Sequence, residues 1–449
     1  MALTCTLGRF IADLTPNRIP DEAVRIARMG FIDCIGAMIA GRTEPCTQIL
    51  KDVLAPGKGS ATLYFSGEQS PGPEAGWING TAAHALDYDD VTLPLRGHAS
   101  TVLVPAILAE AEVLGTSCRD MLVAYIAGYE LWAELVRRDV PMYHQKGFHP
   151  TGIFGALAAA AACAKLRKLD ADHTAIAIAI GASQASGIMS NFGTMTKPFH
   201  AGKAAHSGIM SARLAEAGMT ASTDALEHPQ GFLSAVSPEN KPDRAGDGNL
   251  GEDWAIIRHG LNIKKYPACY AAHRAIDAML DLVDAHPVKP EDVRKVSVHV
   301  SSFASSVLRN RQPDTALAAK FSMEFVMASG LIAHRVSLAE MTDPFVQRKD
   351  VQDTMRLVER ELTDESDEAN PGLAPWDQVK IELVSGQVLE SEQVTRASGH
   401  AERPLTDSQL HEKFEDCLTS SGSEISADVL LGRLQSMPSI SARALTAVH

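Results

Sequence analysis

The chain has 449 residues, which is too long for one hydrophobic core, and we expect two or three domains. Its 45% hydrophobic and 21% charged residues are ordinary for a globular protein. A net charge of −14 without a basic stripe argues against nucleic acid as a partner. No apolar run reaches the length of a membrane-spanning helix, so we expect no membrane partner.

The first part of the chain, to about residue 265, has the three- and four-residue apolar spacing of helices in nearly every segment. The segments with this pattern are 21–42, 75–90, 101–115, 118–138, 156–168, 170–187 and 201–218. Small residues are frequent in them, so neighbouring helices can pack closely. Residues 53–75, rich in Gly, Pro and Ser, are expected to form a loop.

One basic segment stands out in this acidic chain, Thr194–Gly208, with two lysines and two histidines. A helix is expected to begin near Ala201, so the preceding loop amides would lie at a helix N-terminus beside Lys197 and His200. Such an arrangement is suited to a carboxylate or a phosphate. The alternative is a solvated basic turn before a surface helix.

The pattern changes after residue 265. Residues 293–302 alternate like a strand, and 378–394 contain two strand-like runs joined at Ser385-Gly386, which indicates a hairpin. Helices are expected at 316–333 and 348–362, and a last amphipathic helix at 403–418. We therefore predict a mainly α protein, with a large all-helical domain (1–265 and 402–449) and a smaller α+β domain (266–401).

Cofactor motifs are absent or out of context. The sequence Gly246–Gly251 matches GxGxxG but follows a loop rather than a strand, so we reject it as a dinucleotide site. There is no phosphate loop and no HExxH sequence. A metal site is conceivable from five residues, but their spacing is not that of a zinc signature. These five are Asp87, Asp89, Asp90, His98 and His149. We predict neither a metal nor a cofactor.

The number and spacing of the cysteines indicate the cellular compartment of the protein. The chain has seven, widely scattered, and no two form a CxxC pair. They fit reduced thiols better than a disulfide framework. Because the N-terminus also lacks the pattern of a signal peptide, we expect a cytoplasmic protein.

Acid–base chemistry remains, because titratable residues stand at several junctions between loops and helices. A lone histidine is more often structural than catalytic, but five such positions recur along the chain. They are Asp87, His98, His149, Lys197 and Lys264.

The segments around these positions resemble the MmgE/PrpD family. They are ALDYDD, GHAST, GFHPTGIFG, TKPFHAGKAAHSG and KKYPACYAAHRAID, in that order along nearly the whole chain. The family's chemistries include 2-methylcitrate dehydration, cis-aconitate decarboxylation and iminodisuccinate epimerisation. The resemblance implies a helical domain and an α+β domain, a homodimer, a cofactor-free site between the domains, and site residues at the five positions above.

Two positions differ from the decarboxylase pattern, since Phe325 and Val91 stand where that enzyme has a tyrosine and a threonine. Both changes remove hydroxyls, and iminodisuccinate epimerase becomes the best individual match. The expected reaction is cofactor-independent removal of a proton α to a carboxylate of a small di- or tricarboxylate. The alternatives are a lyase of the dehydratase or decarboxylase type and a non-catalytic, anion-binding dimeric scaffold.

Each expected site residue has a role in this scheme. Lys197 and Lys264 would bind substrate carboxylates and stabilise developing charge. His98 and His149 would move the proton, and Asp87 would orient or charge-pair one of these groups. The second-tier candidates are Tyr143, His200 and Lys203.

Overall fold

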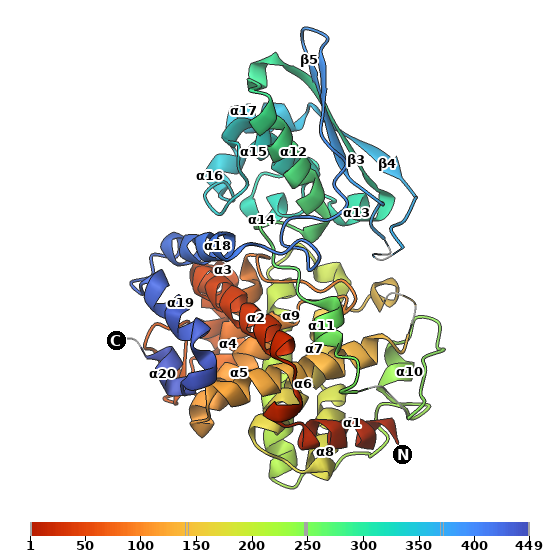
Figure 1. Cartoon of the computed structure of the whole chain (residues 1–449), viewed down its shortest axis with the longest axis vertical. Helices are drawn as coiled ribbons and strands as arrows, with labels where there is room; N and C mark the ends of the chain where they lie inside the picture. Colours follow the sequence, from red (N-terminus) through yellow and green to blue (C-terminus); the bar gives the residue numbers. More distant parts are fainter. Residues whose placement is uncertain are drawn as a thin grey trace. The chain divides into compact units, whose positions relative to one another are not determined.

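The computed structural model describes residues 2–139, 141, 143–246, 250–368, 370 and 372–447. The chain forms two compact units, unit 1 (Met1–Leu261 and His411–His449) and unit 2 (Asn262–Leu410). The sequence analysis places these boundaries at 265/266 and 401/402. The predicted fold class, mainly α with a smaller α+β part, is confirmed (Figure 1).

Unit 1 is a helical assembly with one short two-stranded hairpin. Its helices are α1 (Leu3–Asp13), α2 (Asp21–Ala40), α3 (Pro45–Leu54), α4 (Gly72–Ala85), α5 (Ser100–Leu114), α6 (Cys118–Val136), α7 (Pro150–Leu166), α8 (Ala171–Ser183), α9 (Thr196–Glu216), α10 (Phe232–Val236), α11 (Ala255–His259), α19 (Ala427–Gln435) and α20 (Ala442–Thr446). Helix α18 (Asp407–Ser420) begins in unit 2 and continues into unit 1. The hairpin pairs β1 (Ala61–Thr62) with β2 (Gln69–Ser70).

Helix α9 packs against α4, α5, α7 and α8 (Figure 1). Glycines allow this approach. A Cβ atom at Gly202 would lie 2.2 Å from the Trp77 carbonyl oxygen on α4, and one at Gly80 would lie 2.8 Å from the Gly202 Cα. The backbones of α4 and α9 therefore touch directly, and the end of α4 lies beside the start of α9.

Unit 2 combines a four-stranded sheet with short helices. The strand order is β4 (Val358–Thr363), β3 (Val293–Ser301), β5 (Gln378–Leu383) and β6 (Val388–Glu390). Strand β3 is parallel to β4 and antiparallel to β5, which pairs with β6 in the predicted hairpin. The helices are α12 (His273–Ala285), α13 (Ser302–Val307), α14 (Ala316–Ala319), α15 (Met323–Ala333), α16 (Asp343–Val346) and α17 (Lys349–Met355).

The core of unit 2 lies against the sheet. Val296, Val298 and Val300 of β3 are fully buried, as their alternation predicts. Helix α12 contacts β3 and β5, and α15 contacts β4.

The predicted helix at 348–362 is wrong in its second half. Helix α17 ends at Met355, and β4 follows, paired with β3 from Val296↔Val358 onward. The apolar–polar period of this stretch suits either structure, and the edge of β3 supplies backbone partners that favour the strand.

The predicted start of the basic helix is also wrong. Helix α9 begins at Thr196, not near Ala201. Pro198 falls in the first turn, where a backbone N–H has no intrahelical partner, so the proline does not interrupt the helix.

The sequence analysis excludes a membrane-spanning helix and a dinucleotide site at Gly246–Gly251. Within the described residues, no helix combines the length and apolarity needed to cross a membrane. The rejected GxGxxG sequence contains residues 247–249, which lie outside the described part of the chain.

Candidate active site

A buried ion pair joins the end of α4 to the start of α9. Asp87 follows the C-terminus of α4 with φ of 53°, a left-handed conformation that aspartate tolerates better than most residues. Lys197 is the second residue of α9, and its Nζ lies 2.7 Å from Asp87 Oδ1. Both side chains are buried, so the aspartate neutralises a lysine that would otherwise be costly to bury.

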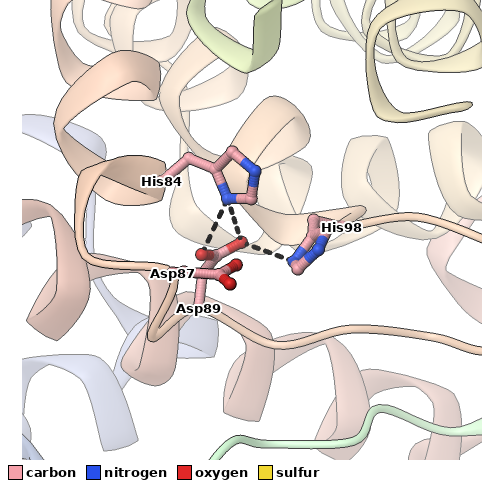
Figure 2. Close-up of side chains that lie close together, drawn as sticks. All are labelled: His84, Asp87, Asp89 and His98. Atoms are coloured by element: carbon pink, nitrogen blue, oxygen red, sulfur yellow. Dashed lines mark hydrogen bonds and ion pairs between the residues drawn. The ribbon is translucent and has the colours of Figure 1, made fainter. Parts of the chain in front are cut away.

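A second acid next to this pair connects two histidines (Figure 2). His84 Nδ1, in the last turn of α4, lies 2.9 and 3.0 Å from the two oxygens of Asp89. His98 Nδ1, just before α5, lies 3.0 Å from Asp89 Oδ2 and 2.9 Å from the carbonyl oxygen of Asp90. The His98 backbone N–H donates to the Thr151 hydroxyl, which fixes the position of the residue.

A third histidine precedes α7. His149 donates its backbone N–H to the carbonyl oxygen of Gly187, at 3.0 Å, and Pro150 begins the helix. Its Nδ1 lies 3.1 Å from Nδ1 of His200 on α9. Since one of these nitrogens must donate and the other accept, the two rings share one hydrogen between them. Gly187, with φ of 127°, packs its backbone against the His200 ring.

Burial and neighbouring charges set the protonation states. Burial lowers the pKa of His149 well below its ordinary value, and the Lys197 charge lowers it further. Burial also lowers the pKa of His84 to about 4, although Asp89 opposes the shift. Burial alone would raise the pKa of Asp89, but the charges and hydrogen bonds of His84 and His98 hold it well below its usual range. At neutral pH the cluster therefore holds an ionised Asp89 and neutral His84 and His149.

Four of the five predicted site residues lie together in unit 1. Asp87 and Lys197 are in direct contact, and the His84 ring links the other two, with ring centroids 4.5 Å from His98 and 6.2 Å from His149.

Lys264, the fifth predicted residue, belongs to unit 2, where it is buried. Its participation in the site stays a prediction.

The three second-tier candidates lie in different surroundings. His200 contacts His149, as described above. Tyr143 is fully buried against Phe154, with ring centroids 4.7 Å apart. Lys203 points to a different neighbourhood, with Nζ 4.6 Å from the Trp77 ring centroid and 3.0 Å from His206 Nδ1.

Sequence reasoning did not single out His84, which lies in the segment 75–90 with helical spacing, and named Asp89 only as a conceivable metal ligand. The sequence offers only their spacing, since His84 stands in the last turn of the helix and Asp89 follows five residues later, and this spacing does not show that the two side chains meet.

The fold also brings possible metal ligands together. His84, Asp87, Asp89 and His98 each offer one atom, and these atoms lie within 4.8 Å of one another. The spacing argument against a metal did not foresee this cluster. However, Asp87 already pairs with Lys197, and both Asp89 oxygens face histidine nitrogens. These pairings favour a proton-handling cluster, and the absence of a metal stays a prediction.

Comparison with known proteins identifies relatives along almost the full chain. The chain is 26% identical to cis-aconitate decarboxylase of Mus musculus over 433 residues, covering 92% of this chain and 86% of the relative. It is 25% identical to cis-aconitate decarboxylase of Homo sapiens, covering 92% and 87%. The cis-aconitate decarboxylase of Aspergillus terreus is 24% identical over 438 residues, covering 92% and 88%. These relatives do not support the choice of iminodisuccinate epimerase as the best individual match.

The family models agree with the motifs quoted from the sequence. Residues 6–245 match the MmgE/PrpD N-terminal domain, and residues 266–431 match the MmgE/PrpD C-terminal domain. The chain belongs to the MmgE/PrpD family.

Proposed function

We propose that this protein is a cofactor-independent acid–base enzyme, which moves a proton at a carbon next to a carboxylate of a small di- or tricarboxylate. One observation carries the proposal. A buried ammonium, Lys197, lies in one cluster with two histidines, His98 and His149, whose ring nitrogens have different hydrogen-bond partners.

The chemistry follows from these groups. Removing a proton, or losing carbon dioxide, beside a carboxylate places negative charge on that carboxylate's oxygens. An ammonium held in a buried site stabilises such charge more strongly than one in water. A neutral imidazole can take up the proton, and the imidazolium that forms can deliver it.

For the reaction class, the relatives support a lyase. In a decarboxylase-like reaction the C–C bond to the departing carboxylate breaks and its electron pair stays on the substrate. A histidine that has taken up a proton from solvent delivers it to the carbon, so each turnover consumes one proton. We therefore propose a lyase in place of the isomerase that the sequence led us to expect.

Epimerisation, with iminodisuccinate as its substrate, is retained as the second candidate for a specific reason. Val91 and Phe325, both buried, carry no hydroxyl to hold against a departing group.

The test is an incubation in D2O with cis-aconitate, 2-methylcitrate and iminodisuccinate separately, followed by NMR. A lyase releases carbon dioxide or water from one of the first two. An epimerase instead introduces deuterium into iminodisuccinate with inversion of configuration at that carbon and releases neither carbon dioxide nor water. Binding of these acids without any exchange or product would contradict the enzyme and favour the anion-binding scaffold.

Matched variants separate the site from general effects of charge. Lys197→Met should lower kcat/KM by roughly 10²- to 10³-fold, as the loss of an oxyanion donor does. Lys58→Met removes the same charge at an exposed position and should leave the rate unchanged.

The homodimer is also part of this proposal, and light scattering of the purified protein tests it.

A further inference from the structure

Asp89 is a buried carboxylate placed between two imidazole rings, with relative exposure of 0%. Its oxygens lie 2.9 and 3.0 Å from His84 Nδ1, and one of them lies 3.0 Å from His98 Nδ1 (Figure 2). An ionised carboxylate only accepts hydrogen bonds, so the hydrogen of each ring must lie on Nδ1. The carbonyl oxygen of Asp90, 2.9 Å from His98 Nδ1, is a second acceptor and fixes the same orientation.

We propose that Asp89 is a positioning residue, which holds His98 in the tautomer with hydrogen on Nδ1 and so directs the Nε2 lone pair to proton transfer with the substrate. The functional half of this statement rests on the proposed function above. The tautomer itself follows from the geometry alone.

His84 contributes by holding Asp89. Its Nδ1 is close to both carboxylate oxygens, which sets the plane of the carboxylate relative to His98. Its Nε2 is buried without a hydrogen-bond partner among the described residues, so nothing there competes with Asp89 for the ring hydrogen. The His84 ring also meets the His98 ring edge to face, at a centroid distance of 4.5 Å, and limits its rotation.

The proton step balances without any co-reactant other than a solvent proton. In the decarboxylase-like reaction His98 Nε2 takes a proton from solvent and delivers it to the carbon that has lost carbon dioxide. In epimerisation it takes the proton of a substrate C–H bond, and the bonding electron pair stays on the substrate. The ring becomes an imidazolium whose charge lies beside the Asp89 carboxylate. Returning the proton to carbon restores the neutral ring with its hydrogen still on Nδ1.

An amide at position 89 would disrupt this arrangement, because it offers one accepting oxygen where the carboxylate offers two. In Asp89→Asn the NH2 group faces His84 Nδ1 in either orientation, because that nitrogen lies 2.9 and 3.0 Å from the two oxygen positions. With the amide oxygen at the Oδ2 position, His98 keeps an acceptor for its Nδ1 hydrogen but loses the carboxylate charge beside its imidazolium. His84 must then expose a lone pair on Nδ1 and change tautomer.

The experiment is 15N NMR of histidine-labelled protein, in wild type and Asp89→Asn, with the variants His84→Gln and His98→Gln assigning the two rings. In the wild type both rings should show protonated Nδ1 and unprotonated Nε2. In Asp89→Asn one ring should reverse, and kcat should fall roughly 10²- to 10⁴-fold with KM little changed. Wild-type His98 protonated on Nε2, or a loss of activity with both tautomers unchanged, would overturn the proposal.

The controls keep the two proposals separate. Asp139→Asn makes the same chemical change at another buried aspartate of unit 1 and should leave both tautomers and kcat unchanged. If Asp89→Asn does not fold, the wild-type spectrum still decides the tautomer. If no carboxylate is turned over, the proposed function fails, while the NMR result still supports or refutes the positioning by Asp89.

Discussion

The contact between α4 and α9 gives the sharpest test of how the fold positions the site. In Gly202→Ala the new methyl group would lie 2.2 Å from the Trp77 carbonyl oxygen and 2.3 Å from Thr81 Oγ1. Real Cβ contacts essentially never fall below 3.0 Å. Because the Trp77 carbonyl oxygen is a backbone atom and cannot rotate away, the two helices must separate by nearly 1 Å. Asp87 follows α4 and Lys197 is the second residue of α9, so this separation acts directly on their ion pair.

Two opposing terms set the size of the effect on stability. Alanine is favoured over glycine inside a helix by up to about 1 kcal/mol. Overpacking a close contact costs about 1–3 kcal/mol, and here it should win because neither backbone can move alone. We expect a net loss of about 1–2 kcal/mol in the free energy of unfolding, measured by urea denaturation. A displacement of 1 Å at a site can also cost about 10²-fold in rate, so kcat/KM should fall more than stability suggests.

The chain offers a matched control in Gly432, which lies in α19 with open space around its Cβ position. Gly432→Ala should stabilise the protein by up to about 1 kcal/mol and leave the rate unchanged. If Gly202→Ala proved as stable as Gly432→Ala and as active as wild type, the backbone contact would not position the site.

Three further predictions concern stability, each measured by denaturation. Thr406→Ala should cost about 1 kcal/mol, because the Thr406 hydroxyl accepts from the Gln409 N–H at the start of α18; equal stability would contradict this cap. Glu110→Ala should cost about 3–5 kcal/mol, because it leaves two arginines without their buried carboxylate; a loss under 1 kcal/mol would refute this. Burial raises the pKa of Glu130 to about 7 from 4.5, so the folded state binds more protons between these values. The contribution of Glu130 to the free energy of unfolding is therefore full below pH 4.5 and is lost as the pH rises through 7, by about 3 kcal/mol at most. If the free energy of unfolding of Glu130→Gln depended on pH as that of the wild type does, this prediction would be refuted.

The sequence predicted those site residues whose local setting is visible along the chain. His98 and His149 stand just before helices, beside glycine or proline, and such junctions can be recognised from one sequence. His84 and Asp89 could not be recognised in this way, because the left-handed backbone of Asp87 lies between them and determines which groups they face. Their hydrogen-bond partners depend on a backbone conformation that the sequence pattern does not specify.

The fold shows the same division. The strand at 293–301 was predicted because its buried valines alternate strictly, whereas β4 was assigned to a helix. Its pairing depends on an edge of β3 that is distant in the sequence, as Val296↔Val358 illustrates. Local periodicity identifies a strand when one face is clearly apolar. It fails when the neighbouring strand decides the structure.

Two features of unit 1 lower the stability of the folded state, and both lie on the segments that carry the buried pair of Asp87 and Lys197. Asp87 adopts a left-handed backbone conformation, which costs a non-glycine residue of order 1 kcal/mol or more. Gly80 and Gly202 give up helix propensity where α4 and α9 touch, at about 1 kcal/mol each. The Asp87 carboxylate and the Lys197 ammonium on these two segments are 2.7 Å apart in a buried setting. Costs that converge on one buried charge are expected where that charge is used, and here they converge on the group that the proposed reaction requires to stabilise an anion.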